Sequence, residues 1–346
     1  MKTKCITRLM IIVILYMHPI LSHSTIVTVD NNYPSQGDFT TLQAAHDAAS
    51  NGDTILIFPS FVPYQGLVIT KRLIIIGSGF EQENDNVKLS ILKSSVSIDA
   101  GGDGTVMEGL LFKDFDNYSD PVGLIINANS TLVRRNKLER IFVYPNHTGN
   151  IISQNHVEFT GNHYQWGSIY VENGNEVLIE NNIVINDNGS VGRGIILYGT
   201  AISGSVCNNV IMVYNLDHGS NTTIDLNYSN CEAYNNIAIQ GNAFGSNFFN
   251  NMGDGTQFPT GNGNMQNVSM NEVFVDHNSY DFHLKPGSPA FGNGLNGDDM
   301  GVYGGARPFV DHGYPGIPSI YFLNVPFYTT PQEGLNVTIK AKSNPQ

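Results

Sequence analysis

The 346-residue chain contains 41 asparagines and 36 glycines, together more than a fifth of its residues, whereas only 14% of its residues are charged. Asn and Gly disfavour helix interiors, which excludes a mainly helical protein, and 34 Phe and Tyr residues provide a core that a disordered chain lacks. The formal net charge of −13 opposes contact with a phosphate backbone and argues against nucleic acid as a partner.

Residues 1–24 are predicted to form a signal peptide. Two lysines and an arginine precede an apolar run at residues 9–21, which is too short to span a bilayer, and small residues follow it. Cleavage near Thr25 leaves 14 basic and 30 acidic residues, a net charge of −16. The alternative is an N-terminal membrane anchor. No later segment is long and apolar enough to span a membrane, so we expect a secreted protein, extracellular or periplasmic.

A short capping helix is predicted next. The segment Thr40-Thr-Leu-Gln43 matches a capping box, and Leu42, Ala45 and Ala49 share one face. Asn51-Gly52 ends the helix, and a strand follows from Thr54 to Phe58. This helix is expected to cover the open end of a core.

A six-residue pattern then recurs: an apolar residue, two variable residues, Asn, one variable residue and an apolar residue. The Asn position is filled by Asn136, Asn155, Asn182, Asn209 and Asn236, and an earlier copy has Gly109 there. The spacings are 27, 19, 27, 27 and 27 residues. Because the last three copies carry Asn-Asn, the register could be off by one.

The repeat predicts an all-β fold, a right-handed parallel β-helix with about three short strands per coil. Asn and Gly adopt left-handed backbone conformations at low cost, so the Asn position is expected at a sharp corner. Stacked Asn side chains can also bond along the column, which makes these residues a structural ladder. In this alignment Cys207 and Cys231 are offset by three residues, about 10 Å along the strand, too far for a disulfide. We therefore expect two free, buried thiols.

Both ends of the chain resemble one family. FTTLQAAHDAASNGDTILI at residues 39–57, followed by LIIIGSG at 73–79, is similar to the start of the pectin-lyase-like superfamily of right-handed parallel β-helix proteins. FHLKPGSPA at 282–290 and DMGVYGG at 299–305 resemble the closing segment of secreted bacterial β-helix proteins. The β-helix domain is accordingly assigned to residues 25–308. A proline-containing β segment, residues 309–346, follows it with two strand-like runs that either pair as a hairpin along the solenoid or belong to an attachment region.

The resemblance implies lyases, hydrolases, esterases or non-catalytic proteins, but no catalytic motif of these families is complete here, so the catalytic residues stay unknown. No cofactor is expected. The loops Glu83-Asn-Asp85 and Asp298-Asp299 could hold Ca²⁺, although acidic loop clusters are more often simply solvated.

The family's substrates lie along the first sheet of the coil, which we assign to residues 123–127, 168–172, 194–198 and 223–227. Alternation predicts inward side chains at Leu124, Ile126, Ile169, Val171, Ile195, Leu197, Ile224 and Leu226. The outward columns are then Ile125, Tyr170, Ile196 and Asp225, and beside them Asn127, Glu172, Tyr198 and Asn227.

These columns supply the candidate substrate-binding residues. Tyr170 and Tyr198 are candidate sugar-stacking platforms. Glu172, Asp225 and Arg193 are candidate polar contacts. The alternative is that they are ordinary outward strand residues. As an acid/base pair, Glu172 and Asp225 are marginal, since two coils separate them by about 9.6 Å along the axis.

A basic cluster at Arg134, Arg135, Lys137 and Arg140 binds carboxylates of a uronic acid polymer, supplies the base of a lyase, or pairs with acidic neighbours such as Glu139 and Glu158. The histidines at 147, 156, 163 and 218 are expected mainly in turns. Two functions follow. The first is a monomeric, secreted carbohydrate-active protein, a polysaccharide lyase or glycoside hydrolase. The second is a non-catalytic β-helix that binds glycans or serves as a surface structural module.

Overall fold

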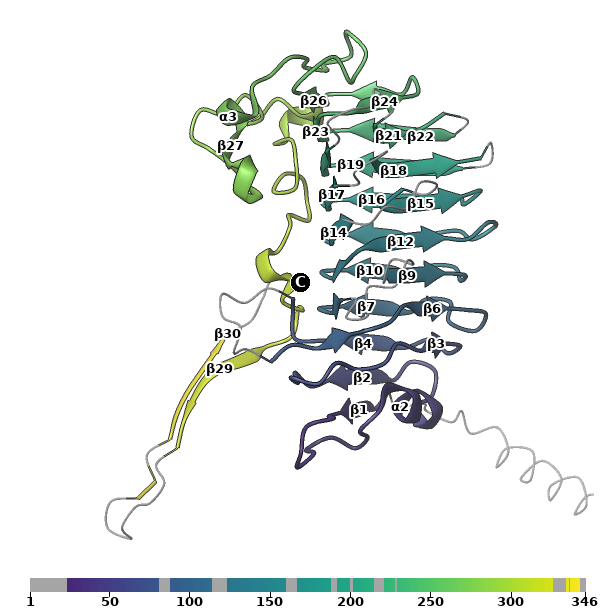
Figure 1. Ribbon diagram of the computed structural model, residues 1–346, viewed down its shortest axis with the longest axis vertical. Helices are drawn as coiled ribbons and strands as arrows, with labels where there is room; N and C mark the ends of the chain where they lie inside the picture. Colours follow the sequence, from purple (N-terminus) through teal and green to yellow (C-terminus); the bar gives the residue numbers. More distant parts are fainter. Residues whose placement is uncertain are drawn as a thin grey trace, which may run out of the picture.

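The chain folds into a right-handed parallel β-helix, as the repeat predicted, with its coils stacked in one column (Figure 1). The computed structural model describes residues 24–80, 88–113, 123–159, 167–187, 192–199, 202–214, 221–227, 229–325, 334–335 and 337–342. Nearly all of the predicted signal peptide lies outside these residues. None of the helices in the described part of the chain is long and apolar enough to cross a membrane.

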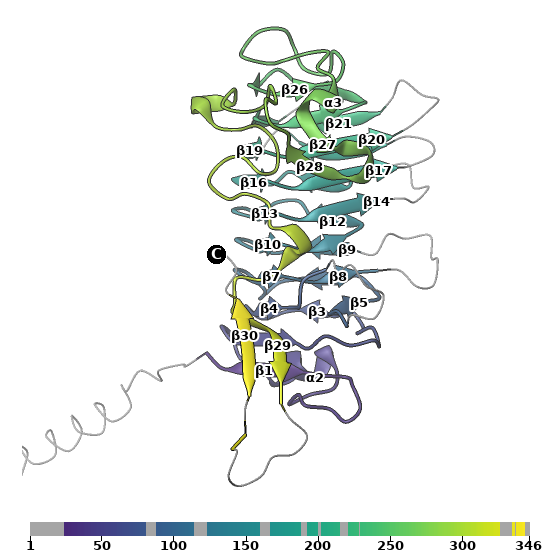
Figure 2. The same ribbon diagram turned by 90° about the vertical axis from the view of Figure 1, so that its left-hand side faces the viewer.

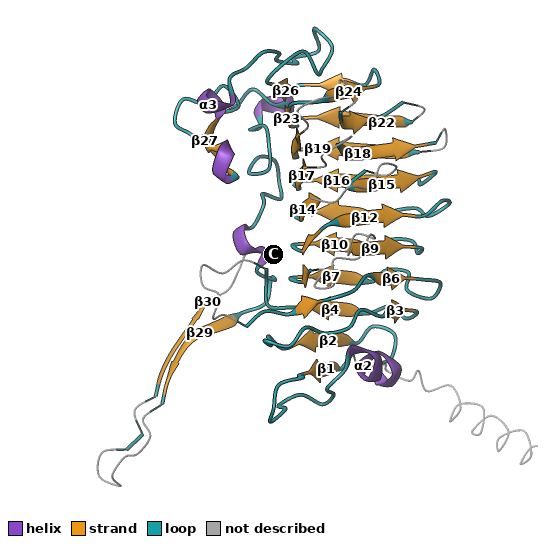
Figure 3. Ribbon diagram, in the orientation of Figure 1, coloured by secondary structure: helices purple, strands orange, loops and turns teal. Residues whose placement is uncertain are grey.

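Each full coil adds one strand to each of three parallel sheets, named here sheets I, II and III in their order along a coil (Figure 3). Sheet I contains β3 (Val68–Ile69), β6 (Val96–Ile98), β9 (Gly123–Ile126), β12 (Arg140–Val143), β15 (Ile169–Glu172), β18 (Arg193–Tyr198), β21 (Thr222–Asp225) and β24 (Asn242–Phe244). Sheet II contains β1 (Ile26–Val29), β2 (Thr54–Ile57), β4 (Ile74–Ile76), β7 (Val106–Glu108), β10 (Leu132–Arg134), β13 (Ile151–Ser153), β16 (Val177–Glu180), β19 (Ser203–Cys207), β22 (Asn230–Tyr234) and β25 (Phe248–Phe249). Sheet III contains β5 (Ile91–Leu92), β8 (Leu111–Phe112), β11 (Lys137–Leu138), β14 (His156–Phe159), β17 (Ile183–Asp187), β20 (Val210–Tyr214), β23 (Ile237–Ile239) and β26 (Met252–Gly253).

The core runs along the axis of the column. Alternate residues of every strand turn inward, and all eight side chains predicted to do so on sheet I are buried in one continuous apolar cluster. A β-helix is stabilised by this stacking, because no single coil can bury its own apolar face.

A ladder of asparagines lies at the corner between sheets II and III. Each ladder side chain except the last donates from Nδ2 to Oδ1 of the Asn one coil further on, at 2.9 to 3.2 Å. The ladder contains Asn136, Asn155, Asn182, Asn209 and Asn236 and continues to Asn251 and Asn264, which the sequence pattern missed because the last spacings shrink to 15 and 13 residues. Its first six members are completely buried.

The left-handed corner position is not the ladder Asn but the residue before it, so that part of the sequence interpretation was wrong. Positive φ angles of 49° to 57° occur at Arg135, Gln154, Asn181, Asn208, Asn235 and Asn250. Gly109, with φ of 74°, aligns with Arg135 rather than Asn136, because Glu108 pairs with Arg134. The corner therefore divides two tasks between neighbouring residues: one supplies the turn and the next supplies the buried amide.

The N-terminal end of the core is covered by α2 (Leu42–Ala48), as predicted. Leu42, Ala45 and Ala49 are buried in the main apolar cluster. The cap differs in detail from the predicted capping box: the N-cap is Thr41, whose Oγ1 accepts a hydrogen bond from the N–H of Ala44 at 3.3 Å. The residue at the third helical position is thus an alanine, which cannot complete a capping box.

A second apolar layer covers the outer face of sheet III. After β26 the chain forms α3 (Met270–Val273), β27 (Phe274–Asp276) and β28 (Asp281–Leu284), and we call residues 268–290 the cover. Phe274 and Phe282 of the cover pack with outward residues of β17, β20 and β23. Figure 2 shows the cover lying against one side of the column.

From the cover the chain returns along the corner toward the N-terminal end, and we call residues 293–316 the strap. In descending order, the side chains of Asn250, Asn235, Asn208, Asn181, Gln154 and Arg135 hydrogen-bond to its backbone. Beyond the strap, β29 (Ser319–Asn324) and β30 (Thr338–Lys342) pair as an antiparallel hairpin, but the hairpin projects away from the coils instead of lying along the solenoid (Figure 1).

The two cysteines of the repeat are free and buried, as expected. Gly204 pairs with Cys231 and Cys207 pairs with Tyr234, which is the three-residue offset that precluded a disulfide. Burial raises the pKa of both thiols to about 11, so both are protonated at neutral pH.

Candidate functional site

The outer face of sheet I carries all five side chains that the sequence analysis proposed for substrate binding. Tyr170 and Glu172 lie on β15, Arg193 and Tyr198 on β18, and Asp225 ends β21. Tyr170, Ile196 and Asp225 pair in one column, and Glu172 pairs with Tyr198 in the next. The cover packs on sheet III, whereas on the outer face of sheet I Tyr198 is 54% exposed.

The sequence analysis assigned four of the eight strands of sheet I, and one strand that it missed, β12, lies inside the candidate face. β12 lies between β9 and β15, so Phe142 stands between Ile125 and Tyr170 in the first column. Tyr144 follows Val143, which pairs with Val171, and therefore stands beside Glu172 in the second. The signal was the alternating run Arg140-Ile-Phe-Val-Tyr144, which was passed over because the coil that contains it is only 19 residues long.

The aromatic side chains form two layers. Phe142 stacks on Tyr170 with ring centroids 5.0 Å apart and an interplanar angle of 21°, and Tyr144 lies 4.8 Å from Phe142. Tyr170 is only 5% exposed, so its ring belongs to the base of the face and offers little surface for stacking. Tyr144 and Tyr198 are 45% and 54% exposed, and these two rings stand at the surface.

Charged groups surround Tyr170. Burial raises the pKa of its hydroxyl to about 12, and the charge of Glu172 adds to this effect, while Arg193 and Arg140 oppose it. The phenol is therefore neutral and able to donate a hydrogen bond at physiological pH. The Arg140 guanidinium also lies over the Phe142 ring, 5.2 Å from its centroid.

The two carboxylates of the face differ in environment. Burial raises the pKa of Asp225, against the opposing effects of Arg193 and of a 2.8 Å hydrogen bond from the Asn227 N–H to Oδ1. Glu172 lies at the outer end of β15, beside Tyr198. The backbone positions are separated by two coils, about 9.6 Å, and by two residues along the strand, about 6.6 Å. The backbone positions of Glu172 and Asp225 are therefore farther apart than those of two carboxylates in direct contact.

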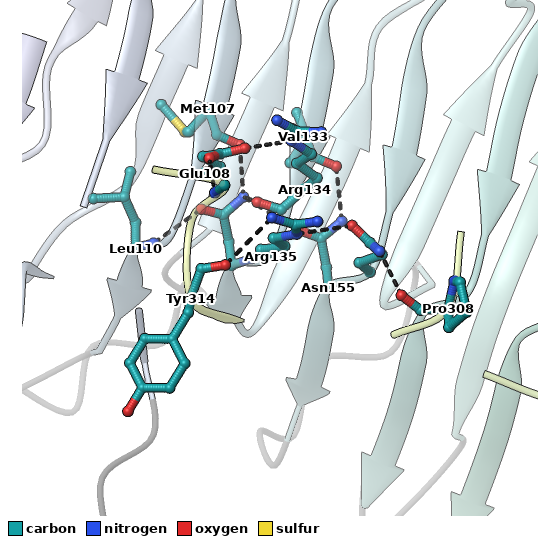
Figure 4. Close-up of polar contacts among 12 residues, drawn as sticks. Met107, Glu108, Leu110, Val133, Arg134, Arg135, Asn155, Pro308 and Tyr314 are labelled. Carbon is teal, nitrogen blue, oxygen red and sulfur yellow. Dashed lines mark hydrogen bonds and ion pairs between the residues drawn. The ribbon is translucent and has the colours of Figure 1, made fainter. Parts of the chain in front are cut away.

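Residues of the basic cluster make separate contacts within the protein, several of which are drawn in Figure 4. Arg134 forms an ion pair with buried Glu108, and Lys137 pairs with Glu158 at 3.0 Å. Arg135 is only 1% exposed and donates from Nη1 to the Tyr314 carbonyl oxygen of the strap at 3.4 Å. The reading of this group as pairing with acidic neighbours is confirmed for Arg134 and Lys137.

Of the four histidines expected mainly in turns, the structure describes two. His156 lies in β14, not in a turn, and its Nε2 is 3.3 Å from Glu158. His147 bonds the Asn127 side chain at 2.8 Å in a turn. Residues 163 and 218 lie outside the described part of the chain.

In the described part of the chain, the candidate calcium loops do not bring together a set of side chains that could coordinate a metal ion. Asp299 Oδ1 accepts a hydrogen bond from the Gly292 N–H at 2.8 Å and its carbonyl oxygen accepts from Asn208. Among the described residues, no group of three His, Cys, Asp or Glu side chains is close enough to hold a metal ion. Glu83 and Asp85 lie outside those residues.

Comparison with known proteins yields likenesses to solved structures alone. No family model matches the chain, and no curated protein matches it. The solved structure of a pectin methylesterase in complex with a hexasaccharide matches with a TM-score of 0.30 and 11% sequence identity, over 77% of this chain and 100% of that chain. A likeness this distant carries no information about activity, and the fold assignment rests on the strand order described above.

Proposed function

We propose that the protein binds a polysaccharide along the outer face of sheet I. The observation that carries this is the row formed by Tyr144, Glu172 and Tyr198 in successive coils, with the two tyrosines exposed and a carboxylate between them. The rings are about 9.6 Å apart along the axis, comparable with the length of a disaccharide unit. Aromatic rings offer apolar faces for the C–H faces of sugars, and the carboxylate accepts hydrogen bonds from hydroxyl groups.

The neighbouring column supports the row. Phe142 and Tyr170 stack in that column, and the positive charges of Arg140 and Arg193 lie close enough to oppose the rise in the pKa of Tyr170. A rigid base limits the entropy lost when the exposed rings bind. The two arginines also make the face suitable for carboxylate-bearing sugars, despite the acidic balance of the whole chain.

The test is a binding screen on polysaccharides of neutral and uronic acid composition, with wild type, Tyr198→Ala and Phe61→Ala. Phe61 is 60% exposed and lies far along the chain from sheet I's central coils, so it is a matched control. We expect at least one polymer to bind and Tyr198→Ala to weaken it about tenfold, about 1.4 kcal/mol, with the control unchanged. Absence of binding to every polymer overturns the proposal.

A second candidate, glycoside hydrolysis, is favoured by the raised pKa of Asp225, which suits a general acid, with Glu172 as the base. The wide separation requires side chains that lean together to reach the ~6.5–9.5 Å of inverting enzymes. Release of reducing ends, lost in Asp225→Asn, supports hydrolysis. Absorbance of unsaturated uronates indicates a lyase instead. Binding without either product leaves a glycan-binding protein.

The chain is further proposed to be an exported member of the pectin-lyase-like superfamily, on the basis of its N-terminal basic and apolar segment and of the sequence resemblance at both ends. N-terminal sequencing of protein recovered outside the cytoplasm tests export. A mature start near Thr25 is expected, and an intact Met1 in exported protein contradicts cleavage.

A further inference from the structure

A pocket opens at the end of the row that carries Tyr144 and Tyr198. Its volume is about 270 Å³, and it lies where β21 turns toward β22 and β24 turns toward β25. It is lined by Leu226, Asn227, Ser229, Cys231, Gly245, Ser246 and Asn247. At about 30 Å³ for each water molecule, this space equals roughly nine waters, which is suitable for one small ring rather than a long ligand.

The pocket continues the proposed binding row. Glu172 pairs with Tyr198, and Ile196 pairs with Asp225, so Asn227 stands one coil beyond Tyr198. Asp225 pairs with Phe244, so Ser246 stands one coil beyond Asn227. Tyr198 is therefore about 4.8 Å along the axis from the position where the pocket begins.

The lining selects for an uncharged ligand with many hydroxyl groups. Its described residues contribute two side-chain amides and two hydroxyls, and none of these residues carries a charged side chain. Amides and hydroxyls both donate and accept hydrogen bonds, as a sugar does. The floor is apolar and fixed: Leu226 is 4% exposed and Cys231 is fully buried.

The walls of the pocket are held in place by their own bonds. The Ser229 hydroxyl donates to the Leu226 carbonyl oxygen at 2.9 Å, and Asn247 Nδ2 donates to the Cys231 carbonyl oxygen at 3.2 Å. These bonds hold the described parts of both walls in place without a ligand, so their shape precedes binding.

We propose that this pocket is a subsite for one neutral sugar unit of the glycan that lies on sheet I. The proposal rests on the proposed function and adds selectivity to it: charged units lie near Arg140 and Arg193, and an uncharged unit occupies the pocket beyond Tyr198. Glycans that end in or contain a neutral unit are therefore bound more tightly than uniformly anionic ones.

The test fills the pocket. Ser246 is exposed, and a Ser246→Trp side chain occupies the space without disturbing a core residue. Thr256→Trp is the matched control, because Thr256 is also exposed and lies in a turn on the other side of the last coils. Asn227→Ala is a second variant that keeps the backbone bond to Asp225 while removing the rim amide.

Binding is measured calorimetrically with gluco-, xylo-, manno- and galactohexaose and with hexagalacturonate, after thermal melts show that each variant is folded. We expect Ser246→Trp to weaken the preferred neutral hexaose at least tenfold and Asn227→Ala about fivefold, with hexagalacturonate and the control unchanged. Equal affinity of Ser246→Trp and wild type for every ligand overturns the subsite but leaves the proposed function intact. Stronger binding of hexagalacturonate than of every neutral hexaose also overturns it. If Ser246→Trp loses binding while Tyr198→Ala binds as well as wild type, the proposed row on sheet I is refuted. If wild type binds none of the ligands, both the subsite and the proposed function are refuted.

Discussion

Asn208 and Asn209 are neighbours in sequence, yet their side chains hydrogen-bond on opposite sides of one corner. Asn208 Nδ2 donates outward to the Asp299 carbonyl oxygen of the strap at 3.0 Å. Asn209 Nδ2 donates inward to the Ile179 carbonyl oxygen at 3.0 Å and to Oδ1 of Asn236 at 2.9 Å. The pair joins the interior ladder to the strap, so one dipeptide stabilises two separate layers of the molecule.

These two positions are predicted to differ in their effect on stability. Asn209→Ala leaves buried backbone and amide groups unpaired in two coils, at a cost of about 3 kcal/mol. Asn208→Gly keeps the positive φ and removes only the bonds to the strap, at a cost of about 1 kcal/mol. Chemical denaturation of both variants checks the order. Equal unfolding midpoints, or a larger loss of stability in Asn208→Gly than in Asn209→Ala, contradict the prediction that the ladder residue matters more than the corner residue.

Glu158 is predicted to make the protein sensitive to acid. A hydrogen bond from His156 and the charge of Lys137 lower the pKa of Glu158 to about 2, although burial opposes them. Since the folded pKa lies below the usual value of 4.5, the stabilisation is present above about pH 4.5 and is lost as the pH falls toward 2. The contribution is at most about 3 kcal/mol.

The check is urea denaturation of wild type and Glu158→Gln between pH 7 and pH 2. Wild type is expected to be the more stable at pH 7, and the difference should shrink between about pH 4.5 and pH 2. Glu172→Gln is the control, because Glu172 lies on a different sheet and outside this cluster. A difference that stays constant over the whole range excludes the predicted linkage.

The cysteines are predicted to react only after unfolding. Cys207 is 4% exposed and Cys231 is fully buried, and burial raises both thiol pKa values to about 11, so little reactive thiolate exists at pH 8. A thiol reagent should therefore label native protein slowly and release two equivalents after denaturation of the mature chain. A third equivalent reports that Cys5, and with it the N-terminal segment, is retained. Rapid labelling of native protein contradicts the buried placement.

The ladder was predictable because one residue type recurs at one spacing, and a buried amide column admits few substitutes for Asn. The corner residue was harder to place, since Arg135 and Gln154 take the same left-handed conformation as Asn181 and Asn208. These two residues bond to the strap, and that tertiary contact offsets the conformational cost that local sequence would assign to them.

The candidate site was only partly predictable. Alternation placed Glu172 and Tyr198 correctly on the outer face of sheet I, because period two follows from backbone geometry alone. It did not reveal that Tyr170 lies buried beside Phe142, since that depends on a strand from a coil of irregular length. The strap and the pocket were equally hidden, because they join segments whose separation in sequence no local pattern encodes.

The two exposed tyrosines are predicted to act independently on a long glycan. Tyr144 and Tyr198 stand about 9.6 Å apart with Glu172 between them, so their contributions to the binding free energy should add. Tyr144→Ala and Tyr198→Ala are each expected to weaken binding of a hexasaccharide about tenfold, and the double variant about a hundredfold. A monosaccharide is too short to contact both rings, so the double variant should weaken its binding no more than the stronger single variant does. Calorimetry on the four proteins, with Phe61→Ala as the control, measures both series. A double variant no weaker than either single variant on the hexasaccharide would mean that the glycan does not lie along this row.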